Sequence, residues 1–153
     1  MNPIRPPFAR TTCGCAEDVE NCKTRPGMLM PSDIALIATK LVAMGVLEKP
    51  GHIEALLRNS PGAVLAHKNE DGTLTKFRVE TIAPATDETG RCVFLTKNNQ
   101  CAIHDVAPAG CAYFDVHQDR ATADERSLWI HRVIALDKDY NRLRRRLQPS
   151  VFG

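Results

Sequence analysis

The six cysteines of this sequence are the residues with the clearest capacity for chemistry, and they fall into two separate groups. The first group lies in TTCGCAEDVENC and the second in GRCVFLTKNNQCAIHDVAPAGC. The first group contains Cys13, Cys15 and Cys22, and the second group contains Cys92, Cys101 and Cys111. Thiolates are soft ligands that select zinc, Cu(I) or iron–sulfur clusters over magnesium or calcium. We therefore interpret both groups as ligands of a metal site.

The cellular compartment decides how clustered thiols are used. The N-terminal stretch MNPIRPPFARTT lacks the apolar run of a signal peptide. The longest apolar stretch, IALIATKLVAMGVL, is interrupted by Lys40 and is too short to span a bilayer. We therefore expect a cytoplasmic protein with no membrane partner, in which thiols bind metal or do redox chemistry rather than form disulfides. The alternative for any single cysteine is simple burial as a small apolar side chain.

The spacing of the cysteines favours a metal without choosing which one. No C-x-x-C occurs, so the zinc-ribbon and thioredoxin patterns are absent, and the spacing also differs from the ferredoxin runs. Our first hypothesis is iron held as an iron–sulfur cluster by four of the thiolates. The alternatives are a structural zinc site that mediates protein interaction, and an enzyme whose iron or zinc keeps a position open for substrate.

Two histidines near the second group are secondary ligand candidates. His104 follows Cys101 with the spacing C-x-x-H, and His117 follows Cys111 at six residues. A hydrogen-bonded imidazole beside the site would show the same spacing, so we rank both below the cysteines. No catalytic residue can be assigned, because a lone Cys–His pair would leave the other cysteines unexplained and no nucleophile motif accompanies it.

A helix and a hairpin are the clearest elements between the two cysteine groups. PSDIALIATKLVAMG predicts a helix with Ser32 as its N-cap, an apolar face and Gly45 at its end. PGHIEALLRN predicts a second short helix. GAVLAHKNEDGTLTKFRVETI predicts a hairpin that turns at Asp71-Gly72, with alternate residues of its second strand facing inward.

A second, tighter hairpin is expected in CVFLTKNNQCAIH, turning around residues 97–100. This hairpin would present Cys92 and Cys101 side by side. Three carboxylates, Asp33, Asp105 and Asp115, could support ligands from a second layer, although such residues more often cap helices and turns.

The tail DERSLWIHRVIALDKDYNRLRRRLQP predicts one long amphipathic helix over about 121–147. Its apolar stripe consists of Trp129, Val133, Leu136, Tyr140, Leu143 and Leu147. Four arginines near its end, in NRLRRRLQ, could bind nucleic acid. Cations are also favourable at a helix C-terminus, and the formal net charge is only +2, so we do not expect a nucleic-acid partner.

Length and composition indicate that the predicted elements and both cysteine groups belong to one small domain. The 153 residues are 43% hydrophobic and 25% charged, which is typical of an ordinary globular protein. We expect an extended arm at 1–12 and a single cysteine-cluster domain at 13–148. The predicted fold class is α+β, with short hairpins packed against helices and loops held by a cysteine-ligated metal.

Two stretches of the sequence carry a resemblance to a known family. CKTRPGMLMPSDIALIA, followed at a distance by GRCVFLTKNNQCAIHDVAPAGCAYFD, resembles the YkgJ-type cysteine-cluster family, described as a zinc- or iron-chelating domain. The matching positions are Leu29, Asp33, Ile34, Cys92, Phe94, Leu95, Cys101, Ile103, His104, Pro108 and Cys111. The family usually has four cysteines in its first cluster, whereas this chain has three, with Asn21 where the penultimate one would stand. The resemblance implies a metal site and fixes neither metal nor reaction.

A site shared by both groups would have consequences for stability and for partners. It would close a loop of about 70 residues, which in the chain-entropy model for disulfides is worth on the order of 4 kcal/mol. We therefore expect the metal-free protein to be less stable. We expect a protein partner, either a redox enzyme or a metal recipient, for an electron-transfer, delivery or accessory role.

Overall fold

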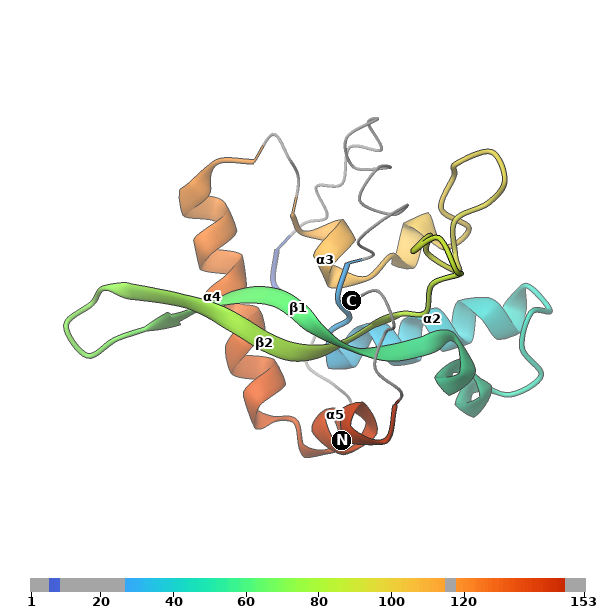
Figure 1. Ribbon diagram of the computed structural model, residues 1–153, viewed down its shortest axis with the longest axis horizontal. Coiled ribbons are helices and arrows are strands. Elements are labelled where there is room, and N and C mark those ends of the chain that lie inside the picture. The colour runs from blue at the N-terminus through green and yellow to red at the C-terminus, as the bar shows by residue number, and fades with distance from the viewer. Residues whose placement is uncertain (1–5, 9–26, 115–117, 148–153) are drawn as a thin grey trace.

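The computed structural model describes residues 6–8, 27–114 and 118–147. Its elements, with η for 3-10 helices, are α2 (Pro31–Ala43), η1 (Pro50–Leu56), β1 (Leu57–Lys68), β2 (Leu74–Pro84), η2 (His104–Val106), α3 (Ala109–Ala112), α4 (Arg120–Leu136) and α5 (Lys138–Arg146). Figure 1 shows the β1–β2 ribbon running through the middle, with α4 crossing it near one end and α2 lying along its other half. Helices and an antiparallel hairpin occupy separate stretches of chain, so the fold is α+β as predicted.

The β1–β2 hairpin pairs from Leu57 opposite Pro84 to Lys68 opposite Leu74. The Asn69 N–H donates to the Thr73 carbonyl at 2.8 Å, and Gly72 has φ +87°, a left-handed conformation that favours glycine. The predicted turn at Asp71-Gly72 is therefore confirmed. The first strand begins earlier than expected, at Leu57. The register shifts between Ser60 and Ala63, and such a bulge accommodates the Pro-Gly of the sequence inside this strand.

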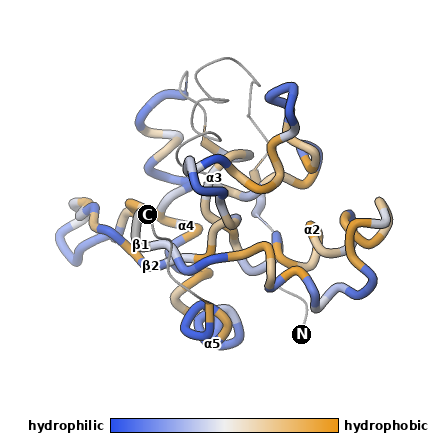
Figure 2. Tube along the Cα trace, turned by 45° about the vertical axis from the view of Figure 1, so that its right-hand side comes forward, coloured by the Kyte–Doolittle hydropathy of each residue, from blue (hydrophilic) through white to orange (hydrophobic). Residues whose placement is uncertain are grey.

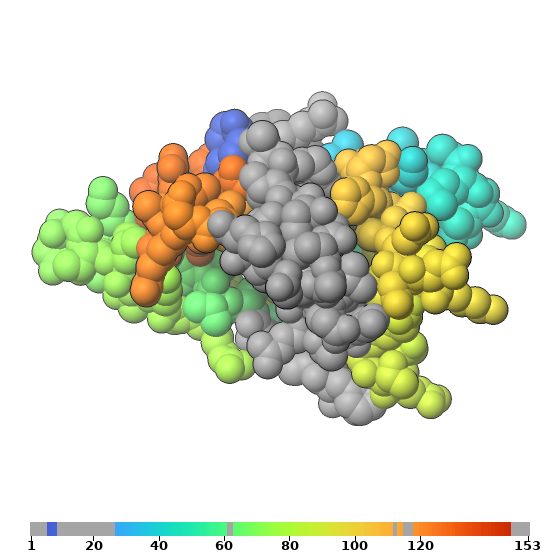
Figure 3. All heavy atoms as spheres, turned by 90° about the horizontal axis from the view of Figure 1, so that it is seen from above, coloured from blue at the N-terminus to red at the C-terminus, as the bar shows by residue number. Residues whose placement is uncertain are grey.

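In β2, only the half away from the turn is buried. Thr81 and Ile82 are fully buried, whereas Phe77 and Val64, nearer the turn, are 40% and 55% exposed. The outer end of the ribbon reaches beyond α4 (Figure 1), and in Figure 3 it forms one end of the molecule, opposite the end of α2. The predicted alternation of buried and exposed positions is wrong for the outer half, because that half projects past the helices.

The tail forms two helices instead of the single helix predicted over about 121–147. α4 ends at Leu136, and Asp137 has extended backbone (φ −91°, ψ 103°). The Asp137 carboxylate accepts from the Tyr140 N–H at 2.8 Å and so caps α5. Leu136 is consequently 82% exposed and does not belong to the predicted apolar stripe. The sequence periodicity continued across Asp137, but local capping divided the helix.

α2 begins two residues earlier than predicted and has a different N-cap, Met30 instead of Ser32. Pro31 is its first residue, and the Met30 N–H donates to the Asp33 carboxylate at 2.8 Å. Ser32 is therefore not the N-cap but a buried residue of the first turn. Gly45, with φ +77°, follows the C-cap Met44 and ends the helix as expected. No described helix has the length and apolar character to cross a bilayer.

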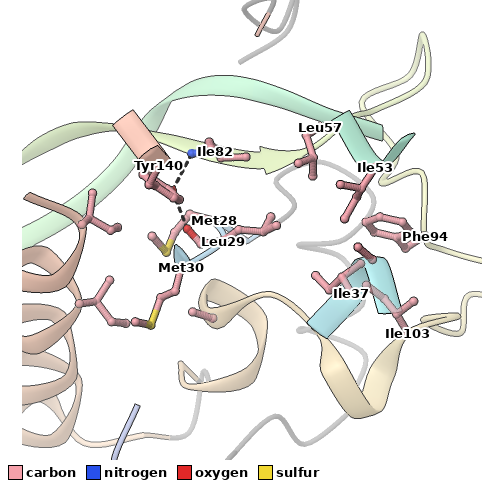
Figure 4. Packing of buried hydrophobic residues seen from close by; sticks show 14 of the residues in the cluster. Met28, Leu29, Met30, Ile37, Ile53, Leu57, Ile82, Phe94, Ile103 and Tyr140 are labelled. Carbon is pink, nitrogen blue, oxygen red and sulfur yellow. Dashed lines mark hydrogen bonds between the residues drawn. The ribbon is translucent and has the colours of Figure 1, made fainter. Parts of the chain in front are cut away.

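Tyr140 connects three segments in the core. Its hydroxyl donates to the Leu29 carbonyl at 2.6 Å and accepts from the Ile82 N–H at 2.8 Å (Figure 4). The Leu29 N–H in turn donates to the Ile82 carbonyl, which places Leu29 as an isolated bridge beside β2. Burial raises the pKa of Tyr140, so this hydroxyl remains protonated. α5, which carries Tyr140, is otherwise mostly hydrophilic (Figure 2).

Candidate metal centre

The structure describes the second cysteine group and not the first. Cys13, Cys15, Cys22 and His117 lie outside the described residues, as does Asp115. Cys92, Cys101 and Cys111 lie between the end of β2 and α3; Cys92 is buried and the other two are half-buried. No disulfide joins these three cysteines to one another.

Cys92 is positioned by the end of the hairpin. It forms an isolated bridge with Thr86, and the Val93 N–H donates to the Ala85 carbonyl at 2.9 Å. Two residues after Cys92, the Phe94 ring is buried near Ile37, Ile53 and Ile103 (Figure 4). The cysteine is thus placed between a backbone pairing and an apolar anchor.

Cys101 is positioned by a tight turn. It pairs with Leu95 in an isolated bridge, and the Thr96 N–H donates to the Gln100 carbonyl at 2.7 Å. Asn99 takes φ 61°, a conformation that Asn tolerates better than most residues. The predicted turn at 97–100 is therefore present, but no strands form around it. Cys101 lies opposite Leu95 and not opposite Cys92, so the predicted pairing of the two cysteines across a hairpin is wrong.

The loop that carries Cys92 is also ordered by its own polar groups. The Asp87 carboxylate accepts from the Thr89 hydroxyl at 2.6 Å and from the Thr89 and Arg91 N–H groups at 2.8 and 3.1 Å. The hydrogen bonds from Thr89 lower the pKa of Asp87. The Arg91 side chain donates to the Thr96 carbonyl and to the Asn99 side chain. These contacts tie the stretch before Cys92 to the turn before Cys101.

Cys111 lies in α3, whose backbone is in close contact with the backbone of Gly27 and Met28. The Gly110 N–H donates to the Met28 carbonyl at 2.9 Å. A Cβ atom on Gly27 would lie 2.6 Å from the Cys111 nitrogen and 2.7 Å from its Sγ. Only a residue without a side chain fits at this crossing. Gly27 and Met28 are therefore packed directly against Gly110 and Cys111.

The Asp33 carboxylate holds α3 against α2. One of its oxygens, Oδ2, accepts from the Met30 N–H and from the Ala109 N–H, each at 2.8 Å. The side chain is buried. Asp33 thus links the N-terminus of α2 to the first residue of α3, two residues before Cys111. These two hydrogen bonds are those of a carboxylate that caps helices, which is the more common role of such residues.

Phe8 is a positioning residue that sequence reasoning missed. Its ring centroid lies 5.4 Å from those of Tyr113 and Trp129, and the Arg126 guanidinium carbon lies 5.2 Å from it. The chain just before the first cysteine group is therefore anchored beside Tyr113, two residues after Cys111. An aromatic residue inside a proline-rich arm was the only sequence signal for this contact.

Arg58 is a second residue that sequence reasoning missed. It lies in β1 with a side chain buried at 9% exposure, and its Nε donates to the Pro84 carbonyl at 2.9 Å. Its Nη1 is buried and has no hydrogen-bond partner within the described ranges. Burial lowers the pKa of the Arg58 guanidinium, and the charge of Cys92 acts in the opposite direction. Arg58 is thus fixed to the end of β2 that leads to the loop of Cys92.

His104 and Asp105, the predicted supporting residues that lie between Cys101 and Cys111 in sequence, do not complete a metal site. His104 is exposed at the start of η2, and the neighbouring Asp105 pairs with Lys40 at 3.1 Å. Across residues 6–8, 27–114 and 118–147, no group of three or more Cys, His, Asp or Glu side chains could hold a metal ion. Among the described residues, Cys92, Cys101, Cys111 and His104 therefore do not form a metal-binding group with one another.

The basic end of α5 is largely engaged in ion pairs with the rest of the fold. Arg144 pairs with Glu80 at 2.5 Å and Arg146 with Glu54 at 2.7 Å, while Arg142 lies 3.4 Å from Asp139. These contacts attach α5 to β2 and η1. They favour the structural interpretation of the arginines over nucleic-acid binding.

A hollow of about 370 Å³ lies between α2, η1 and α5. Its walls include Ile34, Ala38, Ile53 and Leu143, and its acidic members are Glu54, Asp137 and Asp139. Glu54 pairs with Arg146, Asp137 caps α5 and Asp139 faces Arg142. The hollow therefore offers an apolar surface whose carboxylates already make contacts within the fold, and none of the three described cysteines lines it.

Comparisons with protein-family models, with curated proteins and with solved structures gave no match for this chain, so the resemblance to the YkgJ-type cysteine-cluster family stays a prediction.

Proposed function

We propose that the chain is a cytoplasmic metal-binding protein in which cysteines of both groups hold one iron centre, an iron–sulfur cluster. Four thiolates would ligate the cluster, drawn from Cys13, Cys15, Cys22, Cys92, Cys101 and Cys111. Its role would be electron transfer, cluster or metal delivery, or service as an accessory subunit of a redox enzyme. The family resemblance of the sequence agrees with this proposal.

The observation that carries the proposal is the contact of Gly27 with Cys111. Cys22 precedes Gly27 by five residues, and a chain of five residues spans at most about 18 Å. Phe8 likewise precedes Cys13 by five residues and lies against Tyr113. Both ends of the segment that carries the first cysteine group are therefore fixed beside α3. This arrangement supports a site shared with the second group.

The composition of the candidate ligand set supports iron–sulfur or zinc over harder metals. The described cysteines lie on three separate stretches, two of which are anchored in the core through Phe94 and Ile103. Among the described residues, neither these cysteines nor any carboxylate or imidazole forms a group of metal-binding size, so the proposed ligand set depends on cysteines of both groups. A centre built from these residues would consist of thiolates, and thiolates favour iron–sulfur clusters, zinc or Cu(I).

The proposal is tested by anaerobic purification of the full chain, followed by a visible spectrum and by quantification of iron, acid-labile sulfide and zinc on the same sample. We expect a brown protein with matched iron and sulfide. Iron without sulfide would replace the cluster with a mononuclear or oligonuclear iron site and favour an enzyme. Stoichiometric zinc without colour would replace it with a structural zinc site. A metal-free protein from iron- and zinc-replete cells would contradict the proposal.

A further inference from the structure

Parts of both outer edges of the β1–β2 ribbon are covered by other segments of the chain. On β1, the Ala66 N–H points away from β2 and donates to the Ser127 hydroxyl of α4 at 2.8 Å. On β2, the Ile82 N–H donates to the Tyr140 hydroxyl, and the Ile82 carbonyl accepts from the Leu29 N–H at 2.7 Å. These contacts satisfy backbone groups that the partner strand does not reach.

The outer half of the β2 edge has no such cover. Residues of an antiparallel strand alternate between those that bond to the partner strand and those that point outward, so residues 74, 76 and 78 point outward as Ile82 does. The pairing of Lys76 with Ala66 agrees with this, because Ala66 also points outward. Within the part of the chain that the structure describes, no segment hydrogen-bonds to the outward N–H and carbonyl groups of Leu74, Lys76 and Arg78. These residues are exposed, and the ribbon extends past α4 here (Figure 1).

The unpaired charge along this free edge is positive. Arg78 forms no ion pair with any acidic group of the described ranges, and Lys76 makes a surface ion pair with a carboxylate of α4 at 2.9 Å. Glu80, which follows on the same edge, is neutralised by Arg144. The acidic residues at 70–71 lie in the turn, past the end of the strand. A segment that pairs with this edge therefore meets cations.

Apolar side chains accompany these cations on one face of the ribbon. Val64 lies directly opposite Arg78 and is 55% exposed, and Leu74 is 39% exposed. Residues that pair across two strands share a face, as do alternate residues of one strand. A strand added beside β2 would thus lay alternate side chains over a surface that is both apolar and basic.

We propose that residues 74–78 of β2 form a docking edge for an extended acidic segment of a partner protein, which joins the ribbon as a third strand. Backbone hydrogen bonds hold such a segment, and its carboxylates lie near Lys76 and Arg78. A second copy of the chain fits less well, because full overlap of two such edges would place Lys76 opposite Lys76, and like charges directly opposite are destabilising. The inference goes beyond the proposed function and does not depend on a bound metal.

The experiment uses the full chain and a short synthetic peptide in which glutamate alternates with valine, with a lysine–valine peptide for comparison. Amide hydrogen exchange is followed by NMR with and without each peptide. We expect the acidic peptide to protect the amides of Leu74, Lys76 and Arg78, whereas the amides of Thr75 and Phe77 are already protected by pairing with β1. The lysine peptide should protect none of the three. Equal protection by both peptides, or none by the acidic one, would overturn the proposal.

Variants at one strand position separate the backbone contribution from the charge. Arg78→Pro removes an outward N–H and leaves the bonds to β1 in place, so it should weaken peptide binding at least about 10-fold. Val64→Pro is the matched control, because Val64 lies opposite Arg78 and its N–H points to the other edge, and it should bind as the wild type does. Arg78→Thr keeps the N–H and removes the charge, so it should weaken binding about 2- to 5-fold. Wild-type binding by R78P would overturn the proposal.

If the proline variants do not fold, two acidic peptides that carry N-methyl groups on alternate backbone nitrogens decide. The peptide whose methyl groups face β2 should bind at least about 10-fold more weakly than the other, and equal binding would overturn the proposal. An oligothymidylate that gives the same protection would assign the edge to polyanions in general. Protection that rises with protein concentration alone would assign it to a second copy. Either result would overturn the choice of an acidic peptide, and neither would affect the proposed metal centre.

Discussion

Residues 86–113, which carry the second cysteine group, and the hairpin with α4 and α5 are held in place by different means. The hairpin and its helices depend on long regular elements, with a ten-pair strand register and helices capped by Asp119 and Asp137. Residues 86–113 contain only η2 and the four-residue α3. Their positions depend on isolated bridges, turns, buried anchors and one glycine crossing. A segment built in this way gains most from an additional cross-link, which is what a shared metal would supply.

The two regions differ most clearly in the residues that hold each of them to the rest of the chain. Tyr140 connects α5 to β2 and to Leu29 by hydrogen bonds within the regular part. Asp33 and Gly27 connect the start of the described chain to α3, beside Cys111. Changes at Tyr140 should therefore affect stability without affecting the metal. Changes at Asp33 and Gly27 should affect both.

The largest effect is expected from Gly27→Ala. The added Cβ would meet the backbone of Gly110 and Cys111 at 2.6 Å, and backbone cannot give way as a flexible side chain can. We expect a loss of about 3 kcal/mol in the free energy of unfolding, together with loss of the metal. Denaturant unfolding and metal quantification measure the two effects. Gly51→Ala is the matched control, because nothing lies within 4 Å of its Cβ position, and it should change neither quantity. If G27A kept its full metal content, this would contradict the expectation that changes beside α3 affect metal binding as well as stability.

Asp33→Ala should have the next largest effect. The change leaves the N–H groups of Met30 and Ala109 without their charged acceptor in a buried position. We expect a loss of about 2–3 kcal/mol, and weaker metal binding because α3 is no longer held to α2. Asp105→Ala is the control, since that exposed carboxylate pairs with Lys40 at the surface and should contribute less than about 1 kcal/mol. Equal stability of the two variants would contradict the role given to Asp33.

Tyr140→Phe should have a moderate effect that is confined to stability. The Ile82 N–H and the Leu29 carbonyl would lose their partner inside the core, at a cost of about 1–2 kcal/mol. The metal content should stay at the wild-type value, because this contact lies among the regular elements. Thermal unfolding with metal analysis of the same sample checks both expectations. A proportional loss of metal would show that the two regions are not separable.

The smallest effect is expected at Asp87. Its pKa is lowered in the folded chain, so the ionised form contributes stability that is present above the unfolded value, near pH 3.9. This contribution is lost as the pH falls through the lower, folded pKa. The Thr89 amide resonance should follow this change in an NMR titration, and Asp87→Asn should abolish it. A midpoint at or above the ordinary aspartate value would contradict the hydrogen bonding seen in the loop.

The sequence predicted those parts of the fold that depend on local pattern. The turn at Gly72 and the end of α2 at Gly45 followed from glycine chemistry, and the α+β class followed from the change of hydrophobic period. The break at Asp137 was missed because the apolar stripe continues across it, and a capping carboxylate outweighed the stripe. Periodicity reports which face is apolar, and it does not report where a helix stops.

The candidate site was predictable in its residue types and not in its geometry. Clustered thiols pointed to Cys92, Cys101 and Cys111, but the register that sets Cys101 opposite Leu95 depends on the turn between them. Arg58 and Phe8 gave no recognisable pattern, since each acts through a contact with a residue far away in sequence. Such contacts are decided by the packing of whole elements, which a single sequence does not display.

The most direct test of the shared centre is the metal stoichiometry of two variants, each lacking one whole cysteine group, compared with the wild-type chain after anaerobic purification. One variant replaces Cys13, Cys15 and Cys22 by Ser, and the other replaces Cys92, Cys101 and Cys111 by Ser. We expect one metal centre per wild-type chain, lost or strongly depleted in both variants. Full retention of the metal in either variant, with loss in the other, would show that one group binds metal alone and would contradict a centre shared between them.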